Sequence, residues 1–352
     1  MMLSKVNTSS IVGLQAQRVS VEIYVRGGQL PGFMVVGLPD AVVKESKERI
    51  FAALSHCGIQ LPPVKITINL APANVRKDGS AFDLPVAVGL LSALGIIQET
   101  EFPDTMLLGE LSLDGHVQPV RGVLPMAAEA KNDGIHRMIV SAANAAEAAT
   151  VSGLTVYGVN TLADVISLLN GSLDLKPVEP VPFSADFVCD RDFDFSDVKG
   201  QEHAKRALEV AAAGGHNILM IGPPGSGKTM LARRLPSILP KLSFEESLEI
   251  SKLHSISGLI DPRKGLVTRR PFRAPHHSIT NAGLVGGGVH PQPGEVSLAH
   301  HGVLFLDEMP EFRRSALDVM RQPLEDGVLT LTRVQASLTF PSRFMLVGAM
   351  NP

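Results

Sequence analysis

The chain has 352 residues, of which 45% are hydrophobic and 19% are charged. This length suffices for two domains with buried cores, and the composition excludes a disordered or low-complexity protein. The formal net charge of −3 excludes a general attraction for nucleic acid or anionic lipid, so any DNA contact has to come from a local basic feature.

The sequence contains no pattern typical of a secreted or membrane protein. Residues 1–12 are polar and lack the apolar segment of a secretory signal. The longest apolar run, residues 84–97, contains a proline and two glycines and is too short to span a bilayer. Cys57 and Cys189 stand far apart and form no metal pattern, which is typical of thiols in a reducing compartment. We therefore expect a soluble cytoplasmic protein with no membrane partner.

Strands and helices alternate through the first 170 residues. Period-two patterns predict strands over 19–25, 33–36, 65–70, 106–112, 138–140 and 155–157. Helical patterns predict one helix over 40–54 and others that begin near Leu84, Leu124, Ala142 and Leu162. This predicts an α/β or α+β domain over residues 1–170. Residues 171–192 carry three prolines and predict an extended linker, after which a second α/β domain is expected over residues 193–352.

A phosphate-binding loop follows a short apolar strand, residues 217–221, in the second domain. The loop is Gly222, Pro223, Pro224, Gly225, Ser226, Gly227, Lys228 and Thr229. Its glycines allow successive backbone N–H groups to face the phosphates, and the helix expected to follow it through Leu239 adds its partial positive charge. Lys228 is expected to place its charge between the β- and γ-phosphates, and the Thr229 hydroxyl to ligate Mg²⁺. The pattern predicts binding of ATP or GTP.

Two further apolar strands end in polar groups. Residues 303–306 are followed by Asp307 and Glu308. We expect Asp307 to hold Mg²⁺ through water and Glu308 to polarise the attacking water; the alternative is a surface acidic pair at a strand end. Residues 344–349 predict a third strand, and the amide of Asn351 beyond it is expected to orient the water from the opposite side.

Together these segments resemble the AAA+ ATPases. Residues 195–201 are similar to the family's opening segment, and the resemblance implies that Val198 and Gly200 border the adenine. The strings 270–278, 283–288 and 293–302 resemble the magnesium-chelatase-like AAA+ proteins, and most closely the ComM/YifB family. The resemblance covers both domains and implies ATP and Mg²⁺ as cofactors.

The same strings contain histidines and glycines whose roles stay open. His276, His277, His300 and His301 raise a zinc site as an alternative, but adjacent histidines are expected to diverge and no carboxylate or cysteine completes a set, so polar packing is favoured. Residues 283–290 are expected to form a mobile loop lining a central pore.

A hairpin is predicted over residues 328–333 and 337–340, with Arg333 in its turn. In helicases that resemble this arrangement, such hairpins reach nucleic acid in the channel of a ring. A hexameric ring would then carry a positive collar of Arg333 side chains. An ordinary surface hairpin is the alternative.

The first domain resembles the proteolytic domain of Lon proteases. Residues 77–81 are similar to the segment that holds the nucleophilic serine, and residues 109–124 to the segment that holds its lysine base. In ungapped register these positions fall on Ala81 and Leu124. A shift by one residue restores Ser80, but a serine without an adjacent base is a poor nucleophile. The resemblance implies a Lon-protease-like α+β domain that lacks the catalytic dyad, followed by a P-loop AAA+ α/β domain.

The sequence stops at Pro352, directly after the third predicted strand. We expect the AAA+ core to be truncated there, with its lid and arginine finger missing. Arg313, Arg314 and Arg321 are possible contacts between subunits, although no motif marks any of them as the finger. Residues 1–352 are therefore expected to bind ATP weakly and hydrolyse it poorly.

The ComM/YifB resemblance implies an ATP-driven motor on DNA, a homohexameric helicase acting on branched or single-stranded DNA in natural transformation and recombination. One alternative is a chelatase-type ATPase that remodels a metal-insertion partner. Another is an ATP-dependent Lon-like protease. A Lon-like domain ahead of the ATPase favours the first function over the second, and the missing lysine argues against the third.

Overall fold

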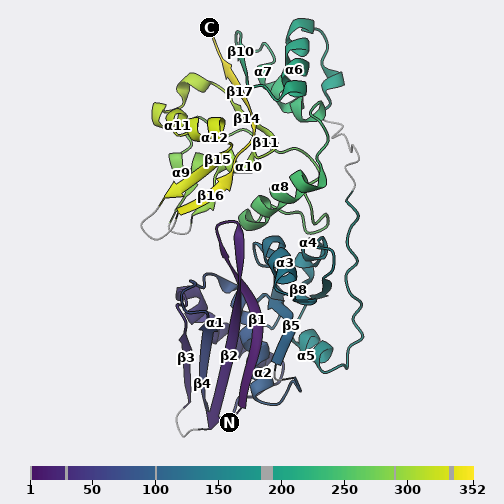
Figure 1. Ribbon diagram of the computed structural model, residues 1–352, viewed down its shortest axis with the longest axis vertical. Coiled ribbons are helices and arrows are strands. Elements are labelled where there is room, and N and C mark those ends of the chain that lie inside the picture. Colours follow the sequence, from purple (N-terminus) through teal and green to yellow (C-terminus); the bar gives the residue numbers. More distant parts are fainter. Residues whose placement is uncertain (1, 28–30, 100, 184–192, 289–290, 333–336) are drawn as a thin grey trace. The chain divides into compact units, whose positions relative to one another are not determined.

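The computed structural model describes residues 2–27, 31–99, 101–183, 193–288, 291–332 and 337–352. The chain forms two compact units: unit 1 is Met1–Pro182 with Gly258–Gly265, and unit 2 is Phe183–Ser257 with Leu266–Pro352 (Figure 1). The chain passes from unit 1 to unit 2 within the predicted linker. Residues 258–265, which the sequence assigns to the second domain, belong to unit 1.

Unit 1 is built on a seven-stranded mixed sheet in the order β3-β4-β2-β1-β5-β8-β9. The strands are β1 (Met2–Val12), β2 (Gln15–Gly27), β3 (Gly32–Val36), β4 (Val64–Ala71), β5 (Glu101–Leu108), β8 (Arg137–Ser141) and β9 (Thr155–Val159). β2 pairs antiparallel with β1 and β4, and the remaining neighbours are parallel. A small ribbon of β6 (Glu110–Leu111) and β7 (Val117–Gln118) stands apart from this sheet.

Helices pack on both faces of the unit 1 sheet. They are α1 (Ala41–His56), α2 (Asp83–Ala93), α3 (Val123–Asn132), α4 (Ala142–Ala149) and α5 (Leu162–Leu169). α1 begins where the Asp40 carboxylate accepts a hydrogen bond from the Val43 amide at 2.7 Å. Every residue of α2 is buried, which explains why its sequence is apolar on all sides. α1 and α2 share one core with β2 and β4, while α3 and α4 share another with β5 and β8.

Strand β1 is an element that the sequence does not predict. Its residues include Ser4, Thr8, Ser9 and Ser10, all of which are buried. Partners for some of these polar groups come from far along the chain: the Ser10 hydroxyl donates to the Arg76 carbonyl at 3.1 Å, and the Asn7 amide donates to the Thr105 carbonyl at 3.3 Å. A buried strand can be polar here because the fold supplies hydrogen bonds to several of its polar groups, although the Ser4 and Thr8 hydroxyls have no partner among the described residues.

Unit 2 is built on a four-stranded parallel sheet in the order β10-β17-β14-β11. The strands are β10 (Ile218–Ile221), β11 (Phe272–Arg273), β14 (Val303–Leu306) and β17 (Met345–Met350). The helices are α6 (Glu202–Gly214), α7 (Lys228–Arg234), α8 (Phe244–Ser257), α9 (Asn281–Val285), α10 (Glu295–Leu298), α11 (Arg314–Asp318) and α12 (Arg321–Asp326). Two ribbons complete the unit, β12 (Gly286–Gly287) with β13 (Gln292–Pro293) and β15 (Val328–Thr332) with β16 (Ser337–Pro341).

Two predicted boundaries in unit 2 differ from the structure. The helix expected to run through Leu239 ends at Arg234, and a 3₁₀ turn over Leu235–Ser237 follows it. Pro236 explains this change, because it has no N–H to continue the α-helical ladder. The glycine-rich segment expected to be a loop forms the end of α9 and then strand β12; residues 289–290 of that segment lie outside the described residues.

Within the part of the chain that the structure describes, no helix has the length and apolar character needed to cross a bilayer.

Candidate functional site

The phosphate-binding loop, the acidic pair and Asn351 meet at one edge of the unit 2 sheet. β10, β17 and β14 are neighbours and run parallel, with Ile218 paired to Val347 and Phe305 paired to the same Val347. Gly222, Asn351 and Asp307 therefore follow the carboxyl ends of adjacent strands, where parallel sheets bind ligands. The central strand of the three is the one that carries Asn351, an order that the sequence does not reveal.

The loop has the backbone shape that its glycines predict. Gly225 and Gly227 have φ of +78° and +85°, the left-handed region that costs glycine little. The loop is tied to the sheet, since the Gly222 amide donates to the Met350 carbonyl at 3.3 Å. Helix α7 begins at Lys228, so its unsatisfied first-turn N–H groups are available to an anion.

Lys228 lies between the loop and β17. Its Nζ donates to the carbonyls of Gly222 at 2.6 Å and Pro223 at 3.1 Å, and to Oδ1 of Asn351 at 3.2 Å. All these acceptors are neutral, and within the described ranges Lys228 forms no ion pair. The positive charge is therefore not neutralised by the protein and is available to a phosphate. The contact with Asn351 also joins two of the predicted catalytic residues.

Thr229 and Asp307, predicted to hold Mg²⁺, contact each other directly. The Thr229 hydroxyl donates to Oδ2 of Asp307 at 2.7 Å, and the other carboxylate oxygen accepts the Glu308 amide at 3.0 Å. A hydroxyl and a carboxylate are the hard oxygen donors that Mg²⁺ prefers, and Mg²⁺ commonly uses one or two such protein ligands beside substrate phosphates. The residues present therefore fit a Mg²⁺–nucleotide complex.

Glu308, the predicted base, is held by a histidine that the sequence analysis assigned only to packing. Oε2 of Glu308 lies 3.4 Å from Nδ1 of His277, and its side chain is 56% exposed. Glu308 has φ of +49°, a region rare for residues other than glycine. The His277 ring lies 4.0 Å from the His276 ring and meets Phe312 edge-on. The position of His277 shortly after β11, the strand beside β14, is the signal that could have identified it.

The segment predicted to border the adenine also touches the loop. Val198 is buried in the core of unit 2, and Gly200 has φ of +72°. The next residue, Gln201, donates from Nε2 to the Ser226 carbonyl at 2.9 Å, which the sequence did not predict. The role of Val198 and Gly200 at a nucleotide base stays a prediction.

The predicted hairpin is present as β15 and β16, which pair from Val328 opposite Pro341 to Thr332 opposite Ser337. Arg333 lies outside the described residues. The β12–β13 and β15–β16 ribbons are neighbours. Leu331 of β15 lies so close to Gly286 of β12 that a Cβ atom at Gly286 would be 3.3 Å from Cδ1 of Leu331. Leu329 and Leu284 bury their side chains in one core, which fixes the base of the hairpin.

The second histidine pair corrects the expectation that no carboxylate joins these residues. Nε2 of His300 and Nε2 of His301 each lie 2.9 Å from Oε2 of Glu249. The rings do not diverge as expected, since their centroids are 3.9 Å apart in this pair. The three side chains have the composition of a metal site.

The hydrogen bonds of His300 argue against metal binding there. Its Nδ1 accepts the Arg343 amide at 3.0 Å, so the neutral ring carries its proton on Nε2 and donates it to Glu249. The Nε2 lone pair is then not free for a metal. Burial lowers the pKa of His300 to about 4, which keeps the ring neutral. Polar packing, the favoured interpretation of the sequence, describes this pair.

In unit 1 the structure does not assemble a serine–lysine pair. The Ser80 hydroxyl donates to the Glu110 carboxylate, while Ala81 and Leu124 are both buried. The Leu124 amide donates to Oε1 of Glu147 at 3.0 Å. Lys77, the lysine nearest in sequence, is covered by protein and donates to the Pro72 carbonyl. The serine therefore has a carboxylate partner in place of an amine base.

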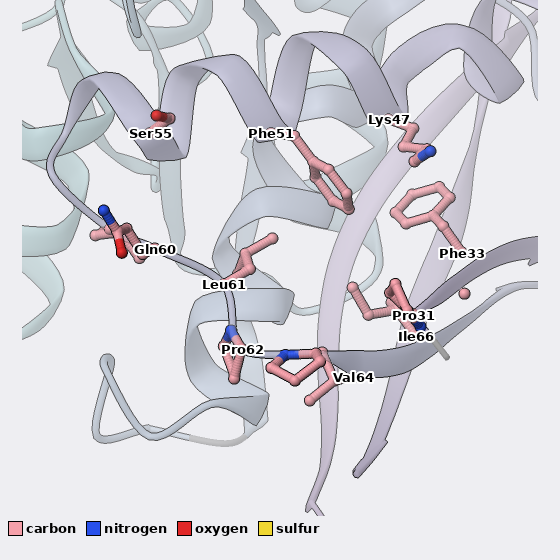
Figure 2. A pocket seen from close by; sticks show the side chains of 13 residues that line it. Pro31, Phe33, Lys47, Phe51, Ser55, Gln60, Leu61, Pro62, Val64 and Ile66 are labelled. Carbon is pink, nitrogen blue, oxygen red and sulfur yellow. The ribbon is translucent and has the colours of Figure 1, made fainter. Parts of the chain in front are cut away.

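A cavity of about 730 Å³ lies between α1 and the start of strands β3 and β4 in unit 1. Figure 2 shows Phe33, Phe51, Leu61 and Val64 facing into it, with Lys47 beside Phe33. Its lining is mainly apolar and lacks the row of glycine amides that binds phosphates. The nucleotide site is therefore assigned to unit 2 and not to this cavity.

Comparison with known proteins gives matches to both units. The family model for magnesium chelatase, subunit ChlI, matches residues 194–352, and a model for subunit ChlI of Mg-chelatase matches residues 21–144. An uncharacterized protein of Mycobacterium tuberculosis is 47% identical over all of this chain and 69% of its own length. Competence protein ComM of Haemophilus influenzae is 44% identical, again over all of this chain and 69% of its own length. The uncharacterized protein YifB of Escherichia coli is 44% identical, over all of this chain and 68% of its own length.

A partial match supports the character of the first domain. Lon protease 2 of Bacillus subtilis is 34% identical over 145 residues, which are 38% of this chain and 25% of that protein. Together with the mixed sheet of unit 1 and the parallel sheet of unit 2, the matches confirm the predicted fold class, a Lon-protease-like domain followed by a P-loop AAA+ domain.

The neutral state of His300 predicts how the stability of unit 2 depends on pH. The pKa of this side chain is about 4 in the folded protein and about 6.5 when unfolded, so between these values only the unfolded chain takes up the proton. Stability should be unaffected by His300 above pH 6.5 and should fall by at most about 3 kcal/mol as the pH drops towards 4.

Urea denaturation at a series of pH values measures this effect. His300→Asn keeps an acceptor for the Arg343 amide and removes the titrating ring, so this part of the pH profile should flatten. His203→Asn, an exposed change on α6, serves as the control and should leave the profile unchanged. A wild-type slope in the His300→Asn protein would contradict the assignment.

Proposed function

Because this chain belongs to the ComM/YifB family of magnesium-chelatase-like proteins, we propose that it is the nucleotide-binding and DNA-contacting part of an ATP-driven motor. The observation that carries the proposal is the meeting of Lys228, Thr229, Asp307, Glu308 and Asn351 at the ends of three neighbouring strands. Each of these groups has a separate task in phosphoryl transfer to water.

In the proposed complex the loop amides and the N-terminus of α7 bind the phosphates of ATP. Lys228 exchanges its carbonyl partners for phosphate oxygens, which its charge favours. Thr229 and Asp307 hold Mg²⁺, which when bound neutralises charge on the phosphate oxygens. Glu308 accepts a proton from the attacking water, and Asn351 orients that water from the side of β17.

DNA is the proposed partner of a homohexameric ring. The β15–β16 hairpin supports this, since Arg333 directly follows β15 in the sequence and the base of the hairpin is fixed in the core of unit 2. The Haemophilus relative is named a competence protein, which favours branched or single-stranded DNA in natural transformation.

The chelatase-type alternative has weaker support, because the magnesium-chelatase 38 kDa subunit of Cereibacter sphaeroides matches only 46% of this chain. A protease function is disfavoured by the partners of Ser80.

Two substitutions in the loop and the acidic pair separate binding from hydrolysis. Lys228→Ala should abolish Mg²⁺-dependent binding of a fluorescent ATP analogue, since the uncompensated cation is lost. Glu308→Gln should keep that binding and reduce hydrolysis by about 100-fold or more, since the amide cannot accept the proton. Lys241→Ala is the control for loss of an exposed lysine in unit 2. Wild-type hydrolysis in either of the first two variants would remove the motor proposal.

The contact between His277 and Glu308 predicts that His277 lowers the rate of ATP hydrolysis in the absence of DNA. His277→Ala frees the carboxylate from its contact with the imidazole, so ATP hydrolysis without DNA should rise by about two- to tenfold and the stimulation by DNA should shrink. His276→Ala removes a stacked ring without touching Glu308 and is the matched control. If both variants lose activity equally, the pair maintains the fold and does not restrain the base.

Arg333 tests the DNA contact separately from the nucleotide site. Arg333→Ala should weaken single-stranded DNA binding and lower the dependence of log affinity on log salt by about one for each protomer that contacts a phosphate. Basal ATP hydrolysis should stay near wild type. Equal loss of both activities would instead indicate a role in folding.

A further inference from the structure

One face of the unit 1 sheet is open over strands β3, β4, β2 and β1 (Figure 1). Side chains alternate between the faces of a strand. Along β2, Val21, Ile23 and Val25 are buried in the core that contains α1 and α2, whereas Glu22 and Tyr24 are partly exposed. On this second face Ala16, near the start of β2, is buried in the core that contains α3 and α4. We call the remainder the open face.

The register of the strands places basic groups around one aromatic ring on the open face. Tyr24 of β2 lies opposite Leu3 of β1 and Thr67 of β4, so it occupies the middle of the face. Arg26 and Lys65 lie opposite each other in the next row on this face. Lys5 lies opposite Glu22 in the row on the other side of Tyr24.

Within strands β1 to β4, Glu22 is the one acidic residue of the open face, and on the neighbouring strand β5 Glu101 is in register with Lys5. Lys5, Arg26 and Lys65 are exposed, and none of them forms an ion pair with any residue in the described ranges. Glu22 accepts a hydrogen bond from the Asn69 amide at 2.9 Å. Arg18 adds a fourth cation and donates to the neutral Oδ1 of Asn7 at 2.9 Å. This concentration of positive charge contrasts with the chain as a whole, whose net charge is −3.

We propose that the open face binds single-stranded DNA, with phosphates at Lys5, Arg26 and Lys65 and a base stacked on Tyr24. Strand spacing and rise put Lys5 and Lys65 roughly 16 Å apart, enough for a few consecutive nucleotides. A central aromatic ring among cations suits unpaired bases, because every base offers a π-face, whereas a duplex hides its bases in the stack. An acidic protein is the other class of partner that would match the cations, and the competition experiment below separates it from DNA.

The residues of this site differ from the nucleotide-binding residues and from Arg333, and the inference does not rest on ATP hydrolysis. This site would give the motor a second DNA contact, in addition to Arg333, for a displaced single strand. Binding to the open face should therefore occur without nucleotide. It should also persist in the Lys228→Ala protein, so failure of the motor proposal would leave this inference standing.

Fluorescence anisotropy of a labelled short oligothymidylate, measured without nucleotide on residues 1–352, tests the charges. The triple variant Lys5→Glu, Arg26→Glu and Lys65→Glu should lower affinity at least about tenfold and reduce the salt slope by about two, since each phosphate contact on a single strand contributes about 0.7. Lys44→Glu, Lys47→Glu and Lys131→Glu make the same change in net charge on α1 and α3. Equal effects of the two triple variants, or no binding by the wild type, would overturn the proposal.

Tyr24 provides a second test that leaves the net charge unchanged. Tyr24→Ala should weaken oligothymidylate binding about tenfold, while Tyr24→Phe should stay within about twofold of wild type because the stacking surface remains. Equal affinity of the Ala and Phe variants would overturn the proposed stacking of a base on Tyr24.

Competition with polyglutamate tests whether the open face binds acidic protein in place of DNA. If polyglutamate displaces the labelled strand as effectively as unlabelled oligothymidylate, the face binds acidic protein and the proposal is wrong.

Discussion

The parallel pairing of β10, β17 and β14 is the constraint on which the candidate site depends. Each strand is short, and the phosphate-binding loop, the Asp307–Glu308 pair and Asn351 follow the carboxyl ends of β10, β14 and β17. Only the shared register brings these groups within contact distance. The contacts of Lys228 with Asn351 and of Thr229 with Asp307 cross between strands that are far apart in sequence. Buried apolar residues such as Val347 and Phe305 hold this register, so the geometry of the site rests on the core beneath it.

Much of the site could be predicted because its signals are local. The glycines of the loop and the apolar strand before it are contiguous, and a carboxylate pair at the end of an apolar run has few other uses. His277, Gln201 and Glu249 could not be assigned in this way, since each acts through a contact with a distant segment. Strand β1 was missed for a related reason: its polar residues lack the apolar pattern of a buried strand, and only the pairing with β2 and β5 makes them a buried element.

Unit 1 has the Lon-protease-like fold, but the positions that resemble the protease's serine–lysine pair do not form such a pair in the described residues. Position 124 carries a leucine that packs in the core, and Ser80 turns to a carboxylate. The sheet meanwhile offers two unlike faces, one filled by α1 and α2 and one that carries exposed cations. A domain without a nucleophile–base pair can still contribute binding, and the proposed contacts of unit 1 and of the Arg333 hairpin would both serve the same negatively charged partner.

We propose that the loop, Thr229 and Asp307 form one site for a metal–nucleotide complex. Electron paramagnetic resonance with Mn²⁺ in place of Mg²⁺, on residues 1–352 with a non-hydrolysable ATP analogue, tests this proposal. We expect protein-bound Mn²⁺ that appears only with the analogue, shows coupling to phosphorus, and is lost when Asp307 is changed to Asn. A spectrum identical to that of the Mn²⁺–nucleotide complex in buffer would contradict it.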